Sequence, residues 1–199
     1  MRNIRFDPVE GKYWDGAREV PRVSRILEET GHGFRGPRGS DWHKEKGTLV
    51  HRATALYDAG TLDWDSLDAT IRPYVEAWKK FKSDTGCKCI AVETILYSED
   101  LDYAGTADRV CVLPKVSGRE MILDIKSGGK TKDHRLQLGA YTAAWADAAL
   151  PRVSSANVYL KPSGKYSLTL FSPEETAANV ADWLAVLAEY RRQEEDLWS

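Results

Sequence analysis

The sequence predicts an α/β fold, a single domain with a central mixed β-sheet flanked by helices. Two observations carry this expectation: helical periodicities precede three consecutive β-rich segments, and one further helix lies before and another after the last two strands. With 199 residues, the chain has the usual length of one domain and can bury a substantial core. We therefore expect one domain over residues 1–199, with a helical N-terminal part near 20–86, a sheet near 88–171 and a C-terminal helix near 173–193.

The N-terminal part is expected to be mainly helical. Residues 12–30 predict a short extended piece, a turn at Asp15–Gly16 and a helix that Pro21 can start, and the glycine-rich residues 31–41 indicate a loop. A helix is expected at 42–58, where the apolar residues with a 3.6-residue period are Leu49, Val50, Ala53 and Leu56. The next helix begins near Pro73 and ends at Gly86, and its apolar face consists of Tyr74, Val75, Trp78 and Phe81.

The second half of the chain is predicted to form a β-sheet. Strands are expected at 89–97, 103–113 and 119–126, and the short polar turns between them favour an antiparallel meander. A helix at 132–149 has a face of small residues, and two strands at 155–161 and 165–171 flank a Pro-Ser-Gly turn. The last helix opens at Ser172 with capping-box spacing, and we expect Val180, Leu184 and Leu187 to form its buried stripe.

The bulk composition excludes several classes of protein. The formal net charge of −2 means that nucleic acid would have to be bound by a local basic patch. The three cysteines, Cys87, Cys89 and Cys111, do not provide a four-ligand zinc or iron–sulfur site and are expected to be free thiols. The N-terminus has no signal-peptide core and no stretch approaches a membrane span, so we expect a cytoplasmic protein.

Three acidic residues lie within consecutive β-rich segments: Glu93, Asp108 and Asp124. A carboxylate in an apolar strand is costly to bury unless it meets a cation, and three on neighbouring strands would repel one another. One divalent cation would resolve both problems. Three separate ion pairs, with Arg109 and Lys126 as partners, would resolve them equally well on this pattern alone.

The Asp124-Ile125-Lys126 segment favours the cation. Residues i and i+2 of a strand leave the same face of the sheet, so acid and ammonium are expected to point into one site. The acid can hold Mg²⁺, and the ammonium can orient a water molecule or neutralise charge on a phosphate. Phosphodiester hydrolysis needs these parts, although an Asp-x-Lys sequence by itself is unspecific.

Five motifs in this order resemble the PD-(D/E)xK nuclease superfamily, and within it the RecB-like exonuclease branch of small stand-alone, phage-type nucleases. They are residues 105–108 (Gly-Thr-Ala-Asp), 124–128 (Asp-Ile-Lys-Ser-Gly), 137–141 (Gln-Leu-Gly-Ala-Tyr), 46–51 (Lys-Gly-Thr-Leu-Val-His) and 20–27 (Val-Pro-Arg-Val-Ser-Arg-Ile-Leu). The resemblance covers about residues 13–145. It implies a restriction-endonuclease-like core and, for a phage-encoded chain, the host cytoplasm.

The resemblance also implies roles at the site. Mg²⁺ or Mn²⁺ would be bound by His51, Asp108, Asp124 and the carbonyl of Ile125. Glu93 would bind a second metal or a water that a metal holds, and Lys126 would hold the nucleophilic water. The branch members with an iron–sulfur cluster use four cysteines, so no cluster is expected here.

DNA is the partner that the resemblance implies. Gln137 and Tyr141, four residues apart on one helix face, would lie near DNA and the active site. Basic candidates for phosphate contact follow the catalytic strand, at Lys130, Lys132 and Arg135, and a second set consists of Arg22, Arg25, Arg35 and Arg38. The sequence contains no readable interface for a homo-oligomer or for a recombination partner protein.

The function expected on this basis is a metal-dependent DNA exonuclease in recombination, repair or phage DNA processing. A structure-specific endonuclease of the same superfamily and a catalytically inactive DNA-binding module remain alternatives. A further alternative is an unrelated α/β protein whose ion pairs imitate the site.

Overall fold

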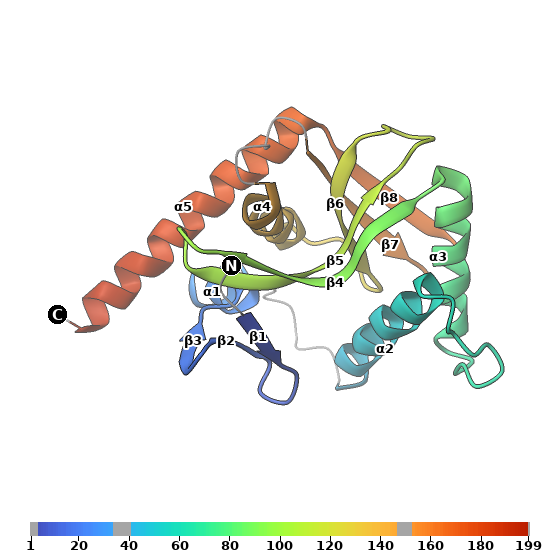
Figure 1. Ribbon diagram of the computed structural model, residues 1–199, viewed down its shortest axis with the longest axis horizontal. Helices are drawn as coiled ribbons and strands as arrows, with labels where there is room; N and C mark the ends of the chain where they lie inside the picture. The colour runs from blue at the N-terminus through green and yellow to red at the C-terminus, as the bar shows by residue number, and fades with distance from the viewer. Residues whose placement is uncertain (1–3, 34–40, 147–152, 199) are drawn as a thin grey trace.

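The computed structural model describes residues 4–33, 41–146 and 153–198 (Figure 1). Its main sheet is mixed and has the strand order β4-β5-β6-β7-β8. The strands are β4 (Lys88–Ser98), β5 (Tyr103–Val112), β6 (Glu120–Lys126), β7 (Ser154–Leu160) and β8 (Tyr166–Phe171). The predicted antiparallel meander of β4, β5 and β6 is confirmed, and so is the α/β fold with a mixed sheet between helices.

The parallel pair of this sheet is β6 and β7, which are joined through helix α4 (Asp133–Ala146). Two parallel neighbours cannot be joined by a tight turn, so the chain must cross one face of the sheet before it returns. β8 then pairs antiparallel with β7. The crossover lays α4 beside the end of β6, where the Asp-x-Lys segment lies.

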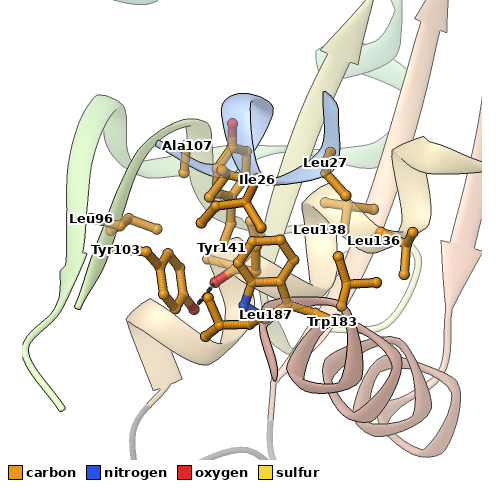
Figure 2. Packing of buried hydrophobic residues seen from close by; sticks show 14 of the residues in the cluster. Ile26, Leu27, Leu96, Tyr103, Ala107, Leu136, Leu138, Tyr141, Trp183 and Leu187 are labelled. Atoms are coloured by element: carbon orange, nitrogen blue, oxygen red, sulfur yellow. Dashed lines mark hydrogen bonds between the residues drawn. The ribbon is translucent and has the colours of Figure 1, made fainter. Parts of the chain in front are cut away.

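The helices cover the two faces of the sheet and enclose two apolar cores. On one face α4 contacts α1 (Val23–Glu29), α5 (Pro173–Trp198) and strands β4–β7. Figure 2 shows this core, in which the Tyr103 hydroxyl donates to the carbonyl of Ala140 at 2.8 Å and Trp183 packs edge-on against Tyr103. The other face carries α2 (Asp41–Asp58) and α3 (Arg72–Thr85), around Trp78, Phe81 and Val75.

The caps of the helices follow the sequence closely. Ser172 and Glu175 form the predicted capping box, because each side chain bonds the backbone N–H of the other, at 2.8 and 3.2 Å. Pro73 lies in the first turn of α3, and Gly86 ends that helix in the left-handed conformation with φ 70°.

Two predicted stripe positions are wrong. Leu184 of α5 is 40% exposed, and the neighbouring Trp183 is buried in its place. Val180 and Leu187 are buried as expected, so the stripe is rotated by one residue toward the larger ring. Leu56 of α2 is 38% exposed, whereas Val50 and Ala53 of that helix are buried.

The N-terminus forms more structure than one extended piece. Strands β1 (Ile4–Asp7), β2 (Lys12–Asp15) and β3 (Arg18–Val20) make a small antiparallel sheet. The Tyr13 hydroxyl lies 2.7 Å from Thr106 Oγ1, and Arg18 pairs with Asp102 at 2.7 Å, so this sheet is fastened to the β4–β5 hairpin. Short polar strands give no clear period, so the sequence indicated only the middle of this unit.

No helix in the described part of the chain is long and apolar enough to cross a membrane.

Candidate active site

The three strand acids lie side by side on neighbouring strands. Val92 pairs with Arg109 and Thr94 with Ala107, so Glu93 lies opposite Asp108. The β5–β6 ladder ends at the pair Arg109–Leu123, and beyond it Asp108 Oδ2 accepts the N–H of Ile125 at 2.6 Å. A carboxylate thus takes the place of a backbone carbonyl where the strands part, and it brings Asp108 next to Asp124.

The backbone of Glu93 breaks the regular alternation of β4. Its φ is +46°, a left-handed conformation that is rare for a residue with a side chain. Ala91 and Leu96 both face the core beneath α4, although residues an odd number of positions apart should face opposite sides of a regular strand. Ala107 and Val110 of β5 show the same break. Backbone strain of this kind costs about 1–3 kcal/mol and collects at functional sites.

His51 enters from helix α2 on the other layer. Its Nδ1 lies 3.2 Å from Asp108 Oδ1 and 3.9 Å from Glu93 Oε1. One ligand atom from each of these three residues falls within 4.8 Å of the others, which is a spacing that could hold a metal ion. Burial opposes a charge on His51, but Asp108 and then Glu93 outweigh it and raise the pKa of His51 to about 10.

Asp124 and Lys126 meet as an ion pair within the same site. Lys126 Nζ lies 2.7 Å from Asp124 Oδ2, and the Asp124 side chain is only 2% exposed. Burial raises the pKa of Asp124 to about 6, because Lys126 compensates only in part and Asp108 adds a second negative charge. The ammonium of Lys126 is the charged partner of Oδ2, and it also acts on the carboxylate of Asp108. Two buried carboxylates therefore share this ammonium.

Two residues of α4 extend the site. Lys126 Nζ donates to Gln137 Oε1 at 2.7 Å, and Gln137 Nε2 donates to the Tyr141 hydroxyl at 2.8 Å. Burial works against the charge on Lys126, but Asp124 and Asp108 outweigh it, so the pKa of Lys126 is raised. Tyr141 is 7% exposed and belongs to the apolar core, so its hydroxyl is what it presents to the site.

The predicted basic residues lie further out. Lys130 donates to Thr169 at 2.9 Å, and Lys132 is exposed. Arg135 turns to α5, where it pairs with Asp182. Arg22 donates to the carbonyl of Gly11 at 2.8 Å and Arg25 pairs with Glu29 at 2.7 Å, while Arg35 and Arg38 lie outside the described residues.

A network behind Glu93 was not predicted. Arg109, which the sequence offered only as an ion-pair partner, is fully buried and bonds both Glu93 and Asp58. Asp58 is the last residue of α2, and no pattern in the sequence marks it. A charged residue at the end of a helix is ordinarily solvated, so only the packing of α2 against α3 reveals its place.

An open pocket of about 570 Å³ adjoins the site. It is lined by residues on successive turns of α2 and by one residue of β4, namely Gly47, Thr48, His51, Arg52, Ala55 and Glu93. Arg52, which is exposed, lines this pocket together with two of the candidate ligands, His51 and Glu93.

Comparison with known proteins yields one family and several distant structures. The family model of the PD-(D/E)XK nuclease superfamily matches residues 51–197. Among solved structures, the chain is similar to the alkaline exonuclease LHK-Exo of Laribacter hongkongensis, with 13% identity, a TM-score of 0.41 and coverage of 89% of this chain and 94% of the other. For LHK-Exo in complex with dAMP these values are 15%, 0.42, 89% and 91%.

No curated protein matches the chain in sequence. The family model, by contrast, spans most of it, including every motif from His51 to Tyr141. The chain belongs to the PD-(D/E)XK nuclease superfamily.

Proposed function

We propose that this protein is a metal-dependent deoxyribonuclease of the RecB-like branch, a single-domain exonuclease that acts in recombination, repair or phage DNA processing. One observation carries the proposal. Carboxylates from three strands and a histidine from α2 meet beside the ammonium of Lys126, at the point where the β5–β6 ladder opens. Two buried carboxylates, Asp108 and Asp124, share the ammonium of Lys126, and a divalent cation would relieve the repulsion between them.

The donor set suits a hard divalent cation. Asp108 and Asp124, with the carbonyl of Ile125 and with His51, would hold Mg²⁺ or Mn²⁺. When bound, the ion supplies a Lewis acid and lowers the pKa of water. Glu93, on the far side of Asp108, would take a second ion or hold a water molecule.

Lys126 would orient the attacking water and offset the charge that develops on the phosphate. Its ammonium is already held by two partners, Asp124 and Gln137, so its position is fixed before substrate arrives. Gln137 is in turn bonded by Tyr141, which makes this pair a support for the lysine as well as a contact for DNA. A preorganised charge of this kind needs no reorganisation during the reaction.

DNA would lie across the pocket beside α2. Arg52 lines it, and the exposed side chains of Lys130 and Lys132 follow the catalytic strand. Arg135 would contribute only after releasing Asp182. Because phosphate contacts release counterions, DNA affinity should fall as the salt concentration rises, and a flat response would contradict this placement.

Cleavage of labelled single- and double-stranded DNA, with Mg²⁺, Mn²⁺ or EDTA, tests the proposal. We expect cleavage that needs metal and is abolished in Asp124→Asn and Lys126→Met. The matched control is the exposed Lys80–Asp84 pair on α3, whose equivalent substitutions should leave cleavage unchanged. Full activity of Lys126→Met would remove that residue from its role, and DNA binding without cleavage would indicate an inactive binding module.

Linear and covalently closed circular DNA separate the two modes of attack. An exonuclease degrades the linear form alone, because the circle offers no end. Cutting of the circle at a similar rate would support the endonuclease instead. His51→Ala should weaken metal binding, and an unchanged metal titration would exclude His51 as a ligand.

A further inference from the structure

A fully buried arginine lies directly behind the candidate metal ligands. Arg109 donates from Nε to Asp58 at 2.7 Å, from Nη1 to Glu93 at 3.0 Å and from Nη2 to Thr54 at 3.2 Å. It also bonds the carbonyl of Asp108, and its guanidinium lies 5.3 Å from the centre of the Trp78 ring. The buried charge of Arg109 is not solvated, so these partners must compensate it, and the loss of one partner changes what the others contribute.

Asp58 is the second counter-ion of this arginine. Its side chain is 3% exposed, and it also accepts from Trp78 Nε1 at 3.1 Å and from Lys82 on α3. Two carboxylates therefore flank one guanidinium, Asp58 from the helical layer and Glu93 from the strand. In this arrangement Arg109 holds Glu93 by one oxygen, Oε1, and does not engage it as a bidentate fork.

We infer that Asp58 and Arg109 are positioning residues, which hold the Glu93 carboxylate where it can bind a divalent cation beside His51 and Asp108. This inference rests on the proposed function. Asp58 satisfies the charge of Arg109, so Glu93 keeps free lone pairs on the side of the site. Without a charge at position 58, Glu93 would be the carboxylate partner of the Arg109 guanidinium. Two N–H groups of Arg109 would then bind both carboxylate oxygens of Glu93 and turn them away from the metal site.

The backbone of Glu93 fits this role. A left-handed conformation at a residue with a side chain persists only when its surroundings over-determine it. The Arg109 contact, together with pairing on both sides at Val92 and Thr94, provides such constraints. The position of the Glu93 carboxylate is therefore constrained by the Arg109 side chain and by the pairing of β4 with β5.

Binding of Mn²⁺ in the absence of DNA, measured by calorimetry and electron paramagnetic resonance, tests the inference. Asp58→Asn keeps the shape of the side chain and removes its charge. We expect about 10- to 100-fold weaker Mn²⁺ binding, the usual effect of removing a partner behind a ligand. The matched control is Lys82→Met, which removes the other cation on Asp58 and leaves the Asp58–Arg109–Glu93 contacts in place. It should bind Mn²⁺ as the wild type does.

A double-mutant cycle shows whether the effect passes through Glu93. Glu93→Gln should weaken Mn²⁺ binding, and adding Asp58→Asn should weaken it no further. Independent, multiplying effects would overturn the inference, as would unchanged Mn²⁺ binding by folded Asp58→Asn.

A milder variant covers the case in which Asp58→Asn does not fold. Thr54→Val removes the hydrogen bond from Arg109 Nη2, and with it the one that the Thr54 hydroxyl donates to the backbone carbonyl of His51, at nearly constant volume. A shift of a few fold in the same direction is expected. No shift in this variant would then refute the inference. If the wild type itself binds no Mn²⁺ and cleaves no DNA, the proposed function fails; if it does both while the variants match it, only the positioning role fails.

Discussion

Replacing Gly139 by alanine is the substitution whose consequence the structure determines most directly. Gly139 lies inside α4, where alanine would ordinarily stabilise a helix by about 0.5–1 kcal/mol. A Cβ at this position, however, would lie 2.2 Å from the carbonyl oxygen of Asn179 and 3.1 Å from the amide nitrogen of Val180. Those atoms are backbone of α5, so no rotation of a side chain can make room.

The magnitude follows from the displacement that is needed. Heavy atoms rest roughly 3.5–4 Å apart, so α4 and α5 would have to separate by more than about 1 Å. Overpacking of a close-packed core costs about 1–3 kcal/mol, which exceeds the gain in helix propensity. We therefore expect a net loss of about 1–2 kcal/mol and a melting temperature lower by roughly 2–8 °C for a chain of this size.

Thermal and urea unfolding followed by circular dichroism provide the assay. Gly47→Ala is the matched control, since Gly47 also lies within a helix but a Cβ there meets nothing nearer than Ser127 Oγ at 4.0 Å. That variant should be as stable as the wild type or slightly more stable. If Gly139→Ala were also neutral or stabilising, the close contact between α4 and α5 would be refuted.

Three further changes test the fold. Trp183→Ala should cost about 3–5 kcal/mol in unfolding experiments, whereas Leu184→Gln at the neighbouring exposed position should cost about 0.5 kcal/mol or less. Ser172→Ala removes a helix cap and should cost about 1 kcal/mol, measured by urea titration. The hydrogen bond from Arg18 lowers the pKa of Asp102, so this half-exposed pair stabilises the fold above the unfolded pKa by at most about 1 kcal/mol. At neutral pH the free energy of unfolding of Arg18→Ala should be lower than that of the wild type by this amount. The two free energies should become equal as the pH falls through the lowered pKa of Asp102, and a difference that persists in acid would contradict the pairing.

The sequence predicted the elements whose signals are local. The proline in the first turn of α3, the glycine at its end and the Ser172 capping box each act within a few residues, and each is found in the structure. The burial of Trp183 in preference to Leu184 could not be predicted, because both positions border the apolar stripe and the choice depends on the space beside Tyr103.

The site shows the same division. Motif order and strand alternation indicated that Asp124 and Lys126 share a face, and these two side chains are in contact. The reversed backbone at Glu93 and the buried charge of Asp58 depend on contacts across strands and layers. Neither a two-residue nor a 3.6-residue period contains that information.

The opening of the sheet at β5 and β6 explains why the candidate ligands gather there. Where the ladder continues, backbone groups satisfy one another and the strand needs no ion. Beyond Arg109–Leu123 the carboxylate of Asp108 accepts the N–H of Ile125, and the strand acquires a negative charge where a neutral carbonyl would otherwise lie. Asp124 and Glu93 add to that charge on either side, while Lys126, Arg109 and His51, whose pKa the acids raise, offset it. The concentration of carboxylates depends on the strand geometry, so loss of a single carboxylate should weaken cation binding while the sheet itself persists.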